Sequence, residues 1–181
     1  HARIGAITNV LTICDRESDV YDFFLTAKDL DEHVLVRSSH NRSILVNDSR
    51  VRLFDHISCQ EPLGVTSFEV PYKEEVKSKT KGKKTKLVDG PNGEKKRKLD
   101  AEIKVTSVTI LPSKSRGQTV KEKIDITVIE VIEKNPPENY EPLHWRLLTT
   151  LTIQTLEEAK LMVNFYCKRW SIEIYFKVLK S

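Results

Sequence analysis

The sequence has few cysteines, and no pattern pairs them. Its three cysteines, Cys14, Cys59 and Cys167, lie far apart and include no C-x-x-C pair. An odd number of isolated thiols argues against a disulfide-stapled secreted domain and fits reduced thiols in a cytosolic protein. The five histidines show no zinc-ligand spacing. The sequence therefore offers neither a disulfide framework nor a zinc module.

Long hydrophobic runs are also missing. No apolar stretch approaches the roughly 18–20 residues that a membrane span needs, and no signal peptide is present. We therefore expect no membrane contact. Because the sequence starts at His1 without an initiator methionine and stops inside a helical pattern, we expect it to be a fragment of a longer protein.

Charge is unevenly distributed along the 181 residues, which suffice for one domain with a large insertion. The net charge is +4, but Tyr72–Lys98 holds ten lysines and one arginine against four acids, a local charge of +7 that leaves −3 for the rest. Such local basicity indicates one anionic partner that binds at one place. A solvated linker is the alternative interpretation of the basic loop at 73–98.

The first forty residues have the pattern of a β-α-β unit. Ile4–Cys14 is apolar and β-branched, as in a buried strand; Val20–Leu30 has helical spacing, and His33–Arg37 is a second short strand. Asp15 then comes directly after the first strand. In open α/β sheets, active-site residues gather at the carboxyl ends of the strands.

The middle of the chain has short alternating runs separated by breaks rich in glycine, proline and lysine. They predict an antiparallel β subdomain over residues 48–139, with strands at Val65–Val70, Ile103–Ile110 and Ile124–Ile132. A further strand is predicted at Leu143–Leu151, after the proline-rich connection.

The last element is a helix that begins with a capping box, formed by Thr155 and Glu158. At 100° per residue, four polar residues fall on one stripe about 60° wide: Tyr166, Arg169, Glu173 and Lys180. A simpler interpretation is an ordinary i,i+4 surface ion pair, worth about 0.3–0.5 kcal/mol, beside a core tyrosine.

The spacing Tyr-x2-Arg-x3-Glu-x6-Lys resembles, position for position, the Y-R-E-K motif of bacterial cut-and-paste transposases of the insertion-sequence-four family. Three upstream segments also resemble family segments in the same order: CDRESDVYDF, HVLVRSSHNR and NPPENYEPLHWRLLTT. The resemblance implies an α/β fold, a partial ribonuclease-H-like core with a large inserted antiparallel β subdomain. Residues 1–47 are then the first part of that core, 48–139 the insertion, and 140–181 the return strand and catalytic helix.

The resemblance also implies roles for individual residues. Asp15 and Glu173 correspond to the second and third acids of a D-D-E triad, which holds two Mg²⁺ or Mn²⁺ ions for phosphoryl transfer. The implied DNA contacts are Tyr166, Arg169, Lys180, Arg37, Arg42 and Trp145. No counterpart of the first acid precedes Asp15, so we expect this fragment alone to be inactive. Glu17 and Asp19 are expected to be surface or capping acids.

Trp145 has two interpretations. In the resembled family a tryptophan in this region stacks on a flipped base, and such stacking requires a ring that is partly exposed without DNA. The alternative is a core tryptophan.

The implied partners are DNA, at transposon ends and target, and a second copy in the synaptic complex of the full-length protein, in the bacterial cytoplasm at the nucleoid. Two other functions stay open. One is a non-catalytic or domesticated DNA-binding module that uses only the basic β subdomain. The other is a different ribonuclease-H-like nuclease, which would need the acids but not the Tyr/Arg/Lys stripe.

Overall fold

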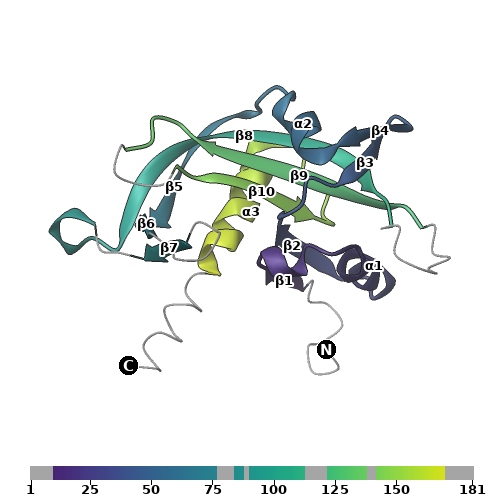
Figure 1. The fold of residues 1–181 in the computed structure, drawn as a ribbon, viewed down its shortest axis with the longest axis horizontal. Coiled ribbons are helices and arrows are strands. Elements are labelled where there is room, and N and C mark those ends of the chain that lie inside the picture. Colours follow the sequence, from purple (N-terminus) through teal and green to yellow (C-terminus); the bar gives the residue numbers. More distant parts are fainter. Residues whose placement is uncertain (1–9, 77–83, 88–89, 113–121, 138–141, 170–181) are drawn as a thin grey trace.

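A computed structural model describes residues 10–76, 84–87, 90–112, 122–137 and 142–169 (Figure 1). The helices are α1 (Tyr21–Asp29), α2 (Leu53–Ser58) and α3 (Leu156–Lys168), and a 3-10 turn covers Arg16–Ser18. The strands are β1 (Leu11–Cys14), β2 (His33–Arg37), β3 (Ser43–Val46), β4 (Ser49–Arg52), β5 (Gly64–Pro71), β6 (Lys73–Val76), β7 (Lys84–Leu87), β8 (Lys96–Ile110), β9 (Ile124–Glu133) and β10 (His144–Thr149).

Eight of these strands form one sheet. Its order is β1-β2-β10-β9-β8-β3-β4, and β5 pairs with β8 beside that path. Only β1 and β2 are parallel; β10 then lies antiparallel to both β2 and β9. The strands β6 and β7 make a separate two-stranded sheet, so the basic segment contains a hairpin.

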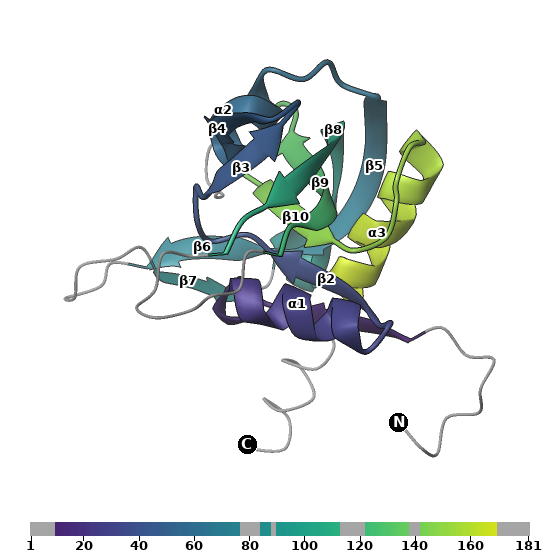
Figure 2. The same cartoon turned by 90° about the vertical axis from the view of Figure 1, so that its right-hand side faces the viewer.

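The large sheet is covered on both faces. Along β9, Ile129 and Val131 belong to the hydrophobic cluster under α3, whereas Ile126 and Val128 belong to the cluster under α1 and α2. This double coverage explains why β9 is buried at almost every position, including Thr127 and Glu130, since side chains on both of its faces are covered. Figure 2 shows α3 and α2 on opposite sides of the sheet. Within the described residues, no helix is long and apolar enough to cross a membrane.

The strands predicted between 48 and 139 are present, but they do not form a sheet of their own. Through β9 and β10, the long strand β8 continues the sheet that β1 and β2 begin. The boundary placed after residue 47 falls in the turn between β3 and β4. The predicted division into a core and an insertion therefore follows the order of segments along the chain. That these segments are separate domains stays a prediction.

The β3–β4 hairpin and α2 were not predicted. The hairpin turn consists of Asn47 and Asp48, both with positive φ (48° and 60°). Two residues with positive φ are the mark of a type I′ turn, which favours asparagine and aspartate and matches the twist of the paired strands. The Asn-Asp pair between alternating residues was therefore a usable signal.

The capping box at the start of α3 is confirmed. Thr155 accepts a hydrogen bond from the Glu158 backbone N–H (3.3 Å), and the Glu158 carboxylate accepts one from the Thr155 backbone N–H (3.0 Å). Beyond the cap, four residues at helical spacing are buried against the sheet: Ala159, Met162, Val163 and Tyr166.

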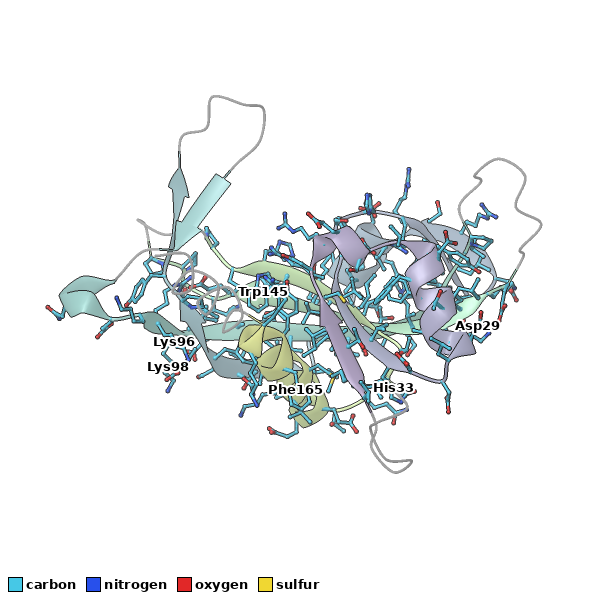
Figure 3. The ribbon with its side chains drawn as sticks, turned by 90° about the horizontal axis from the view of Figure 1, so that it is seen from below. Asp29, His33, Lys96, Lys98, Trp145 and Phe165 are labelled. Atoms are coloured by element: carbon cyan, nitrogen blue, oxygen red, sulfur yellow. The ribbon has the colours of Figure 1, made fainter. Side chains whose placement is uncertain are left out.

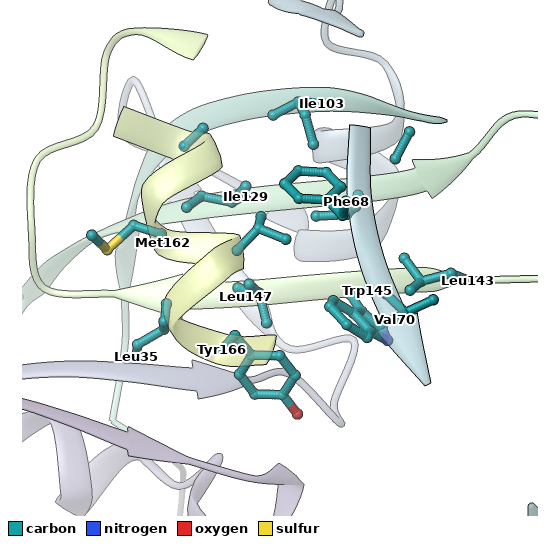
Figure 4. Close-up of a cluster of buried hydrophobic side chains, with 14 of the residues drawn as sticks. Leu35, Phe68, Val70, Ile103, Ile129, Leu143, Trp145, Leu147, Met162 and Tyr166 are labelled. Carbon is teal, nitrogen blue, oxygen red and sulfur yellow. The ribbon is translucent and has the colours of Figure 1, made fainter. Parts of the chain in front are cut away.

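Trp145 on β10 is part of this core. The expectation of a partly exposed ring, which base stacking requires, is therefore wrong for this structure. The relative exposure of Trp145 is 4%, and its ring meets that of Tyr166 edge to face, with centroids 5.2 Å apart. Figure 4 shows Trp145 among the apolar side chains between the sheet and α3. The sheet face that β10 presents to α3 fixes this position, because Trp145 and Leu147 alternate with residues that point the other way.

The core position of Trp145 predicts a large loss of stability on truncation. Trp145→Ala should cost about 3–5 kcal/mol, which lowers the melting temperature by roughly 6–20 °C in a domain of this size. Thermal unfolding followed by circular dichroism measures this, with Trp145→Phe as the control that keeps an aromatic ring. A melting temperature within about 4 °C of the parent protein for Trp145→Ala would contradict the core assignment.

Candidate functional site

The candidate site begins at the edge of the sheet where β1 and β2 end. These strands are parallel, with Cys14 opposite Val36, so their carboxyl ends lie side by side. Asp15 follows β1 at once in an extended conformation, and Arg37 is the last residue of β2. The predicted β-α-β unit therefore brings an acid and a base to one edge.

Helix α3 and its C-cap residue, Arg169, supply two groups that contact Asp15. The Tyr166 hydroxyl donates a hydrogen bond to Asp15 Oδ1 (3.2 Å), and Arg169 Nη2 lies 3.3 Å from Asp15 Oδ2. Tyr166 is fully buried, so the packing of the helix on the sheet determines where its hydroxyl lies. Figure 4 shows Tyr166 at the end of α3 within the core cluster.

Two arginines flank the aromatic pair beneath Asp15. The Arg37 guanidinium lies 5.9 Å from the centroid of the Trp145 ring, and that of Arg169 lies 5.5 Å from the centroid of Tyr166. Both distances are in the range of cation–π contacts. The aromatic rings thus support two guanidinium groups whose charges both act on the Asp15 carboxylate.

The surroundings of Asp15 favour its ionised form. Partial burial alone would raise the pKa of its carboxyl. The hydrogen bond from the Arg16 backbone N–H, the charge of Arg169, the Tyr166 hydroxyl and the charge of Arg37 together outweigh burial and lower that pKa below its ordinary value. Asp15 is therefore an anion at neutral pH.

Tyr166 responds in the opposite sense. Burial, and then the negative charge of Asp15, raise the pKa of the Tyr166 hydroxyl above its ordinary value. The phenol therefore keeps its proton and acts as a hydrogen-bond donor.

The structure brings together some of the predicted site residues and not others. Asp15, Tyr166, Arg169 and Arg37 converge, with Trp145 as the buried support. Glu173 and Lys180 lie outside the described residues.

Arg42 does not join this group. Its guanidinium binds the Asp19 carboxylate and donates a hydrogen bond to the Asp19 backbone carbonyl (2.8 Å). Asp19 in turn is neither a surface acid nor an N-cap, because its side chain is buried and α1 is preceded by Val20 without a side-chain cap. Glu17 is exposed, as expected. No local pattern distinguished Asp19 from an ordinary capping aspartate.

A basic groove adjoins the end of α3. It has a volume of about 700 Å³ and lies between β5, the start of β8 and the helix. Its charged lining consists of Lys95, Lys96, Lys98, Lys168 and one acid, Glu69. Figure 3 shows Lys96 and Lys98 on the same side of the molecule as Phe165 of α3. The described end of the basic segment is therefore close to the helix that carries Tyr166.

The described residues contain one carboxylate suited to a metal ion at this edge. Asp15 is ionised, and its side chain is 45% exposed, so its oxygens are accessible ligands of the kind that Mg²⁺ prefers. No group of three or more His, Cys, Asp or Glu side chains in the described ranges could hold an ion. A metal centre here would need further acids besides Asp15.

The electrostatics of Asp15 give a testable result. Arg169→Gln should raise the pKa of the Asp15 carboxyl toward its ordinary value, because a lowering charge is removed. Carbon-13 NMR titration of the Asp15 carboxyl measures it, with Lys168→Gln as the control for an exposed neighbouring cation. The ionised carboxylate stabilises the fold at neutral pH, and this contribution disappears as the pH falls through the lowered pKa. An unchanged titration in Arg169→Gln would contradict the ion pair.

Comparison with known protein families agrees with this geometry. A family model described as the transposase DDE domain matches residues 8–181. The match includes β1 with Asp15, every strand of the large sheet, and α3 with Tyr166. Since it spans nearly the whole sequence, the chain belongs to the transposase DDE domain family.

Proposed function

We propose that this domain is the catalytic core of a DNA transposase of the insertion-sequence-four, Y-R-E-K type, which cuts and joins DNA at transposon ends by phosphoryl transfer. The observation that carries the proposal is the contact of Asp15 with both Tyr166 and Arg169. Asp15 thus meets two residues of the resembled motif that follow it by 151 and 154 positions in the chain, at the carboxyl edge of two parallel strands.

In this proposal Asp15 and Glu173 are the second and third acids of the catalytic triad. Asp15 would hold Mg²⁺ or Mn²⁺ through its exposed, ionised carboxylate. Glu173 follows Arg169 by four residues, and the periodicity of the sequence predicts that it shares the helix face of Tyr166 and Arg169. When bound, a pair of such ions supplies an activated nucleophile and neutralises charge on the leaving oxygen.

The other residues of the site would bind the phosphates of the DNA backbone or orient the Asp15 carboxylate. Arg169 and Arg37 present guanidinium groups beside Asp15, and guanidinium groups bind phosphate oxygens through paired hydrogen bonds. Tyr166 would hold the Asp15 carboxylate in one orientation. Lys180, the last residue of the motif, would add a further phosphate contact, and the basic groove beside α3 would receive flanking duplex.

The partners follow from this role. The substrate is DNA, at both transposon end and target, and the full-length protein would act as a homodimer in the synaptic complex at the bacterial nucleoid. Because Trp145 is buried, base flipping through this residue would require its ring to leave the core.

A non-catalytic DNA-binding module is the second candidate, and the basic groove is the observation that favours it. Such a module needs cations but no exposed acid among them. The ionised Asp15 between Arg37 and Arg169 would weaken phosphate binding if it had no other use. A ribonuclease-H-like nuclease of another kind would not need the contacts from Tyr166 and Arg169.

Removal of either proposed acid should abolish DNA cleavage but leave DNA binding intact. In the full-length protein, Asp15→Asn and Glu173→Gln should each abolish cleavage of transposon-end DNA while affinity for that DNA is retained, since each change removes one metal-holding charge. Gel assays of cleavage and binding at fixed salt measure both. Glu17→Gln, an exposed acid two residues from Asp15, is the matched control and should cleave normally. Full cleavage by Asp15→Asn would refute the catalytic assignment.

Arg169 should contribute a phosphate contact that does not depend on sequence. Arg169→Ala should weaken binding to any duplex and reduce the slope of log K against log salt by about one. Lys28→Gln is the control, because Lys28 is an exposed cation on α1, on the opposite face of the sheet from α3. An unchanged salt slope in Arg169→Ala would remove Arg169 from the proposed phosphate contacts.

A further inference from the structure

Asp19 is a fully buried carboxylate at the end of the turn that follows β1. Its side chain has 0% exposure. It accepts hydrogen bonds from Ser38 Oγ (3.2 Å), Ser39 N (2.6 Å), Ser39 Oγ (3.3 Å) and His40 N (3.1 Å), it pairs with the Arg42 guanidinium, and His40 Nδ1 lies 3.4 Å away. Every one of these partners comes from the segment that follows β2.

The two segments are tied together by further bonds. The Arg16 carbonyl oxygen lies 3.2 Å from Ser39 Oγ, as a second acceptor for the one proton of that hydroxyl, and Arg42 donates to the carbonyl of Asp19 itself (2.8 Å). A buried charge costs several kcal/mol unless it is paired and hydrogen-bonded. The number of donors around Asp19 offsets this cost only while both segments keep their positions.

Only a few residues separate Asp19 and its partners from Asp15 and Arg37 of the candidate site. Between Asp15 and Asp19 there is a single turn, closed by the bonds Ser18 N to Asp15 O (3.1 Å) and Asp19 N to Arg16 O (3.2 Å). On the other segment, Ser38 follows Arg37 directly, and the Ser38 N–H is held by the Arg146 carbonyl of β10 (2.7 Å). Short, hydrogen-bonded segments therefore connect Asp19 and its partners to Asp15 and to Arg37.

We propose that Asp19 is a positioning residue, which fixes Asp15 and Arg37 relative to each other by joining the segments after β1 and β2. The structural half of this inference stands on the contacts alone. Its consequence for catalysis rests on the proposed function. Asp19 lies away from the Tyr166–Asp15–Arg169 contact and acts through the backbone of the turn.

A buried acid can also serve stability alone, and the same chain offers a matched example. Glu130 on β9 is likewise 0% exposed, with Arg146 Nε at 2.8 Å and His144 Nε2 at 2.9 Å. It lies on the sheet face of α1 and α2, because Ile129 and Val131 on either side of it face α3. Glu130→Gln therefore removes a comparable buried charge whose side-chain partners, Arg146 and His144, both belong to β10.

The first test uses native-state hydrogen exchange on this chain. Asp19→Asn keeps the shape of the side chain but removes its charge and turns one acceptor into a donor. The amide of Ser18, which bonds Asp15 O, should exchange about tenfold faster or more after correction for global stability, which corresponds to roughly 1.4 kcal/mol of local opening. In Glu130→Gln the Ser18 amide should be unchanged. Equal Ser18 exchange in the two variants would overturn the positioning role.

The second test uses the full-length protein at a temperature where each variant is folded. Asp19→Asn should lower the cleavage rate at saturating DNA by about tenfold to a hundredfold, the cost of a misplacement on the order of 1 Å, while the dissociation constant for DNA stays within about twofold. Glu130→Gln should cleave at the normal rate. Should Asp19→Asn fail to fold, Ser39→Ala replaces it and removes the contacts of Ser39 Oγ with Asp19, the Arg16 carbonyl and His40 Nδ1.

The two tests separate the inference from the function it rests on. If the unmodified full-length protein does not cleave transposon-end DNA, the proposed function fails, and the exchange of Ser18 still decides the structural half. If the unmodified protein cleaves and Asp19→Asn cleaves equally fast per folded molecule, the positioning role is overturned while the proposed function stands.

Discussion

The site depends on one contact, the meeting of Asp15 with Tyr166 and Arg169 across 151 or more residues of sequence. The contact forms only if the chain, after β9 and β10 have paired into the sheet, comes back as α3 to the edge where β1 ends. The sheet order, with β10 between β2 and β9, provides this return. The capping box of Thr155 and Glu158 then fixes where the helix starts, and so which residues reach the edge.

Apolar packing makes that polar contact possible. The Tyr166 ring lies in the core against Trp145, and its hydroxyl projects from the core to Asp15. Tyrosine suits this position because it combines a large apolar ring with one polar atom. The buried Trp145 therefore contributes to the site through the ring of Tyr166. The position of the Asp15 partner is thus determined by core residues as much as by the charged ones.

Local patterns in the sequence predicted β1, β2, α1, the strands of the middle region and the capping box, because each depends on neighbours within a few residues. The stripe of Tyr166 and Arg169 followed from helix geometry, and Asp15 from its place after a strand. The burial of Trp145 and Asp19 and the single continuous sheet were not predictable in this way. They depend on pairing between segments far apart in sequence, such as Asp19 with Arg42 or β8 with β9, which no local pattern encodes.

The described part of the chain contains four acid–arginine pairs, and exposure separates one from the rest. In the pairs Asp19–Arg42, Glu130–Arg146 and Glu133–Arg97, the acid is 0–1% exposed and fixed by further hydrogen bonds. Asp15, paired with Arg169, is 45% exposed. A buried pair cannot exchange its partner without leaving a charge unpaired in the core, at a cost of about 3–5 kcal/mol. In the proposed function, Asp15, the acid at the strand edge, would release Arg169 to a phosphate and accept a cation in its place. The arginines are exposed to similar extents in three of these pairs, 16% for Arg42 and Arg169 and 19% for Arg146, so it is the exposure of the acid that distinguishes Asp15 and suits it to the proposed reaction.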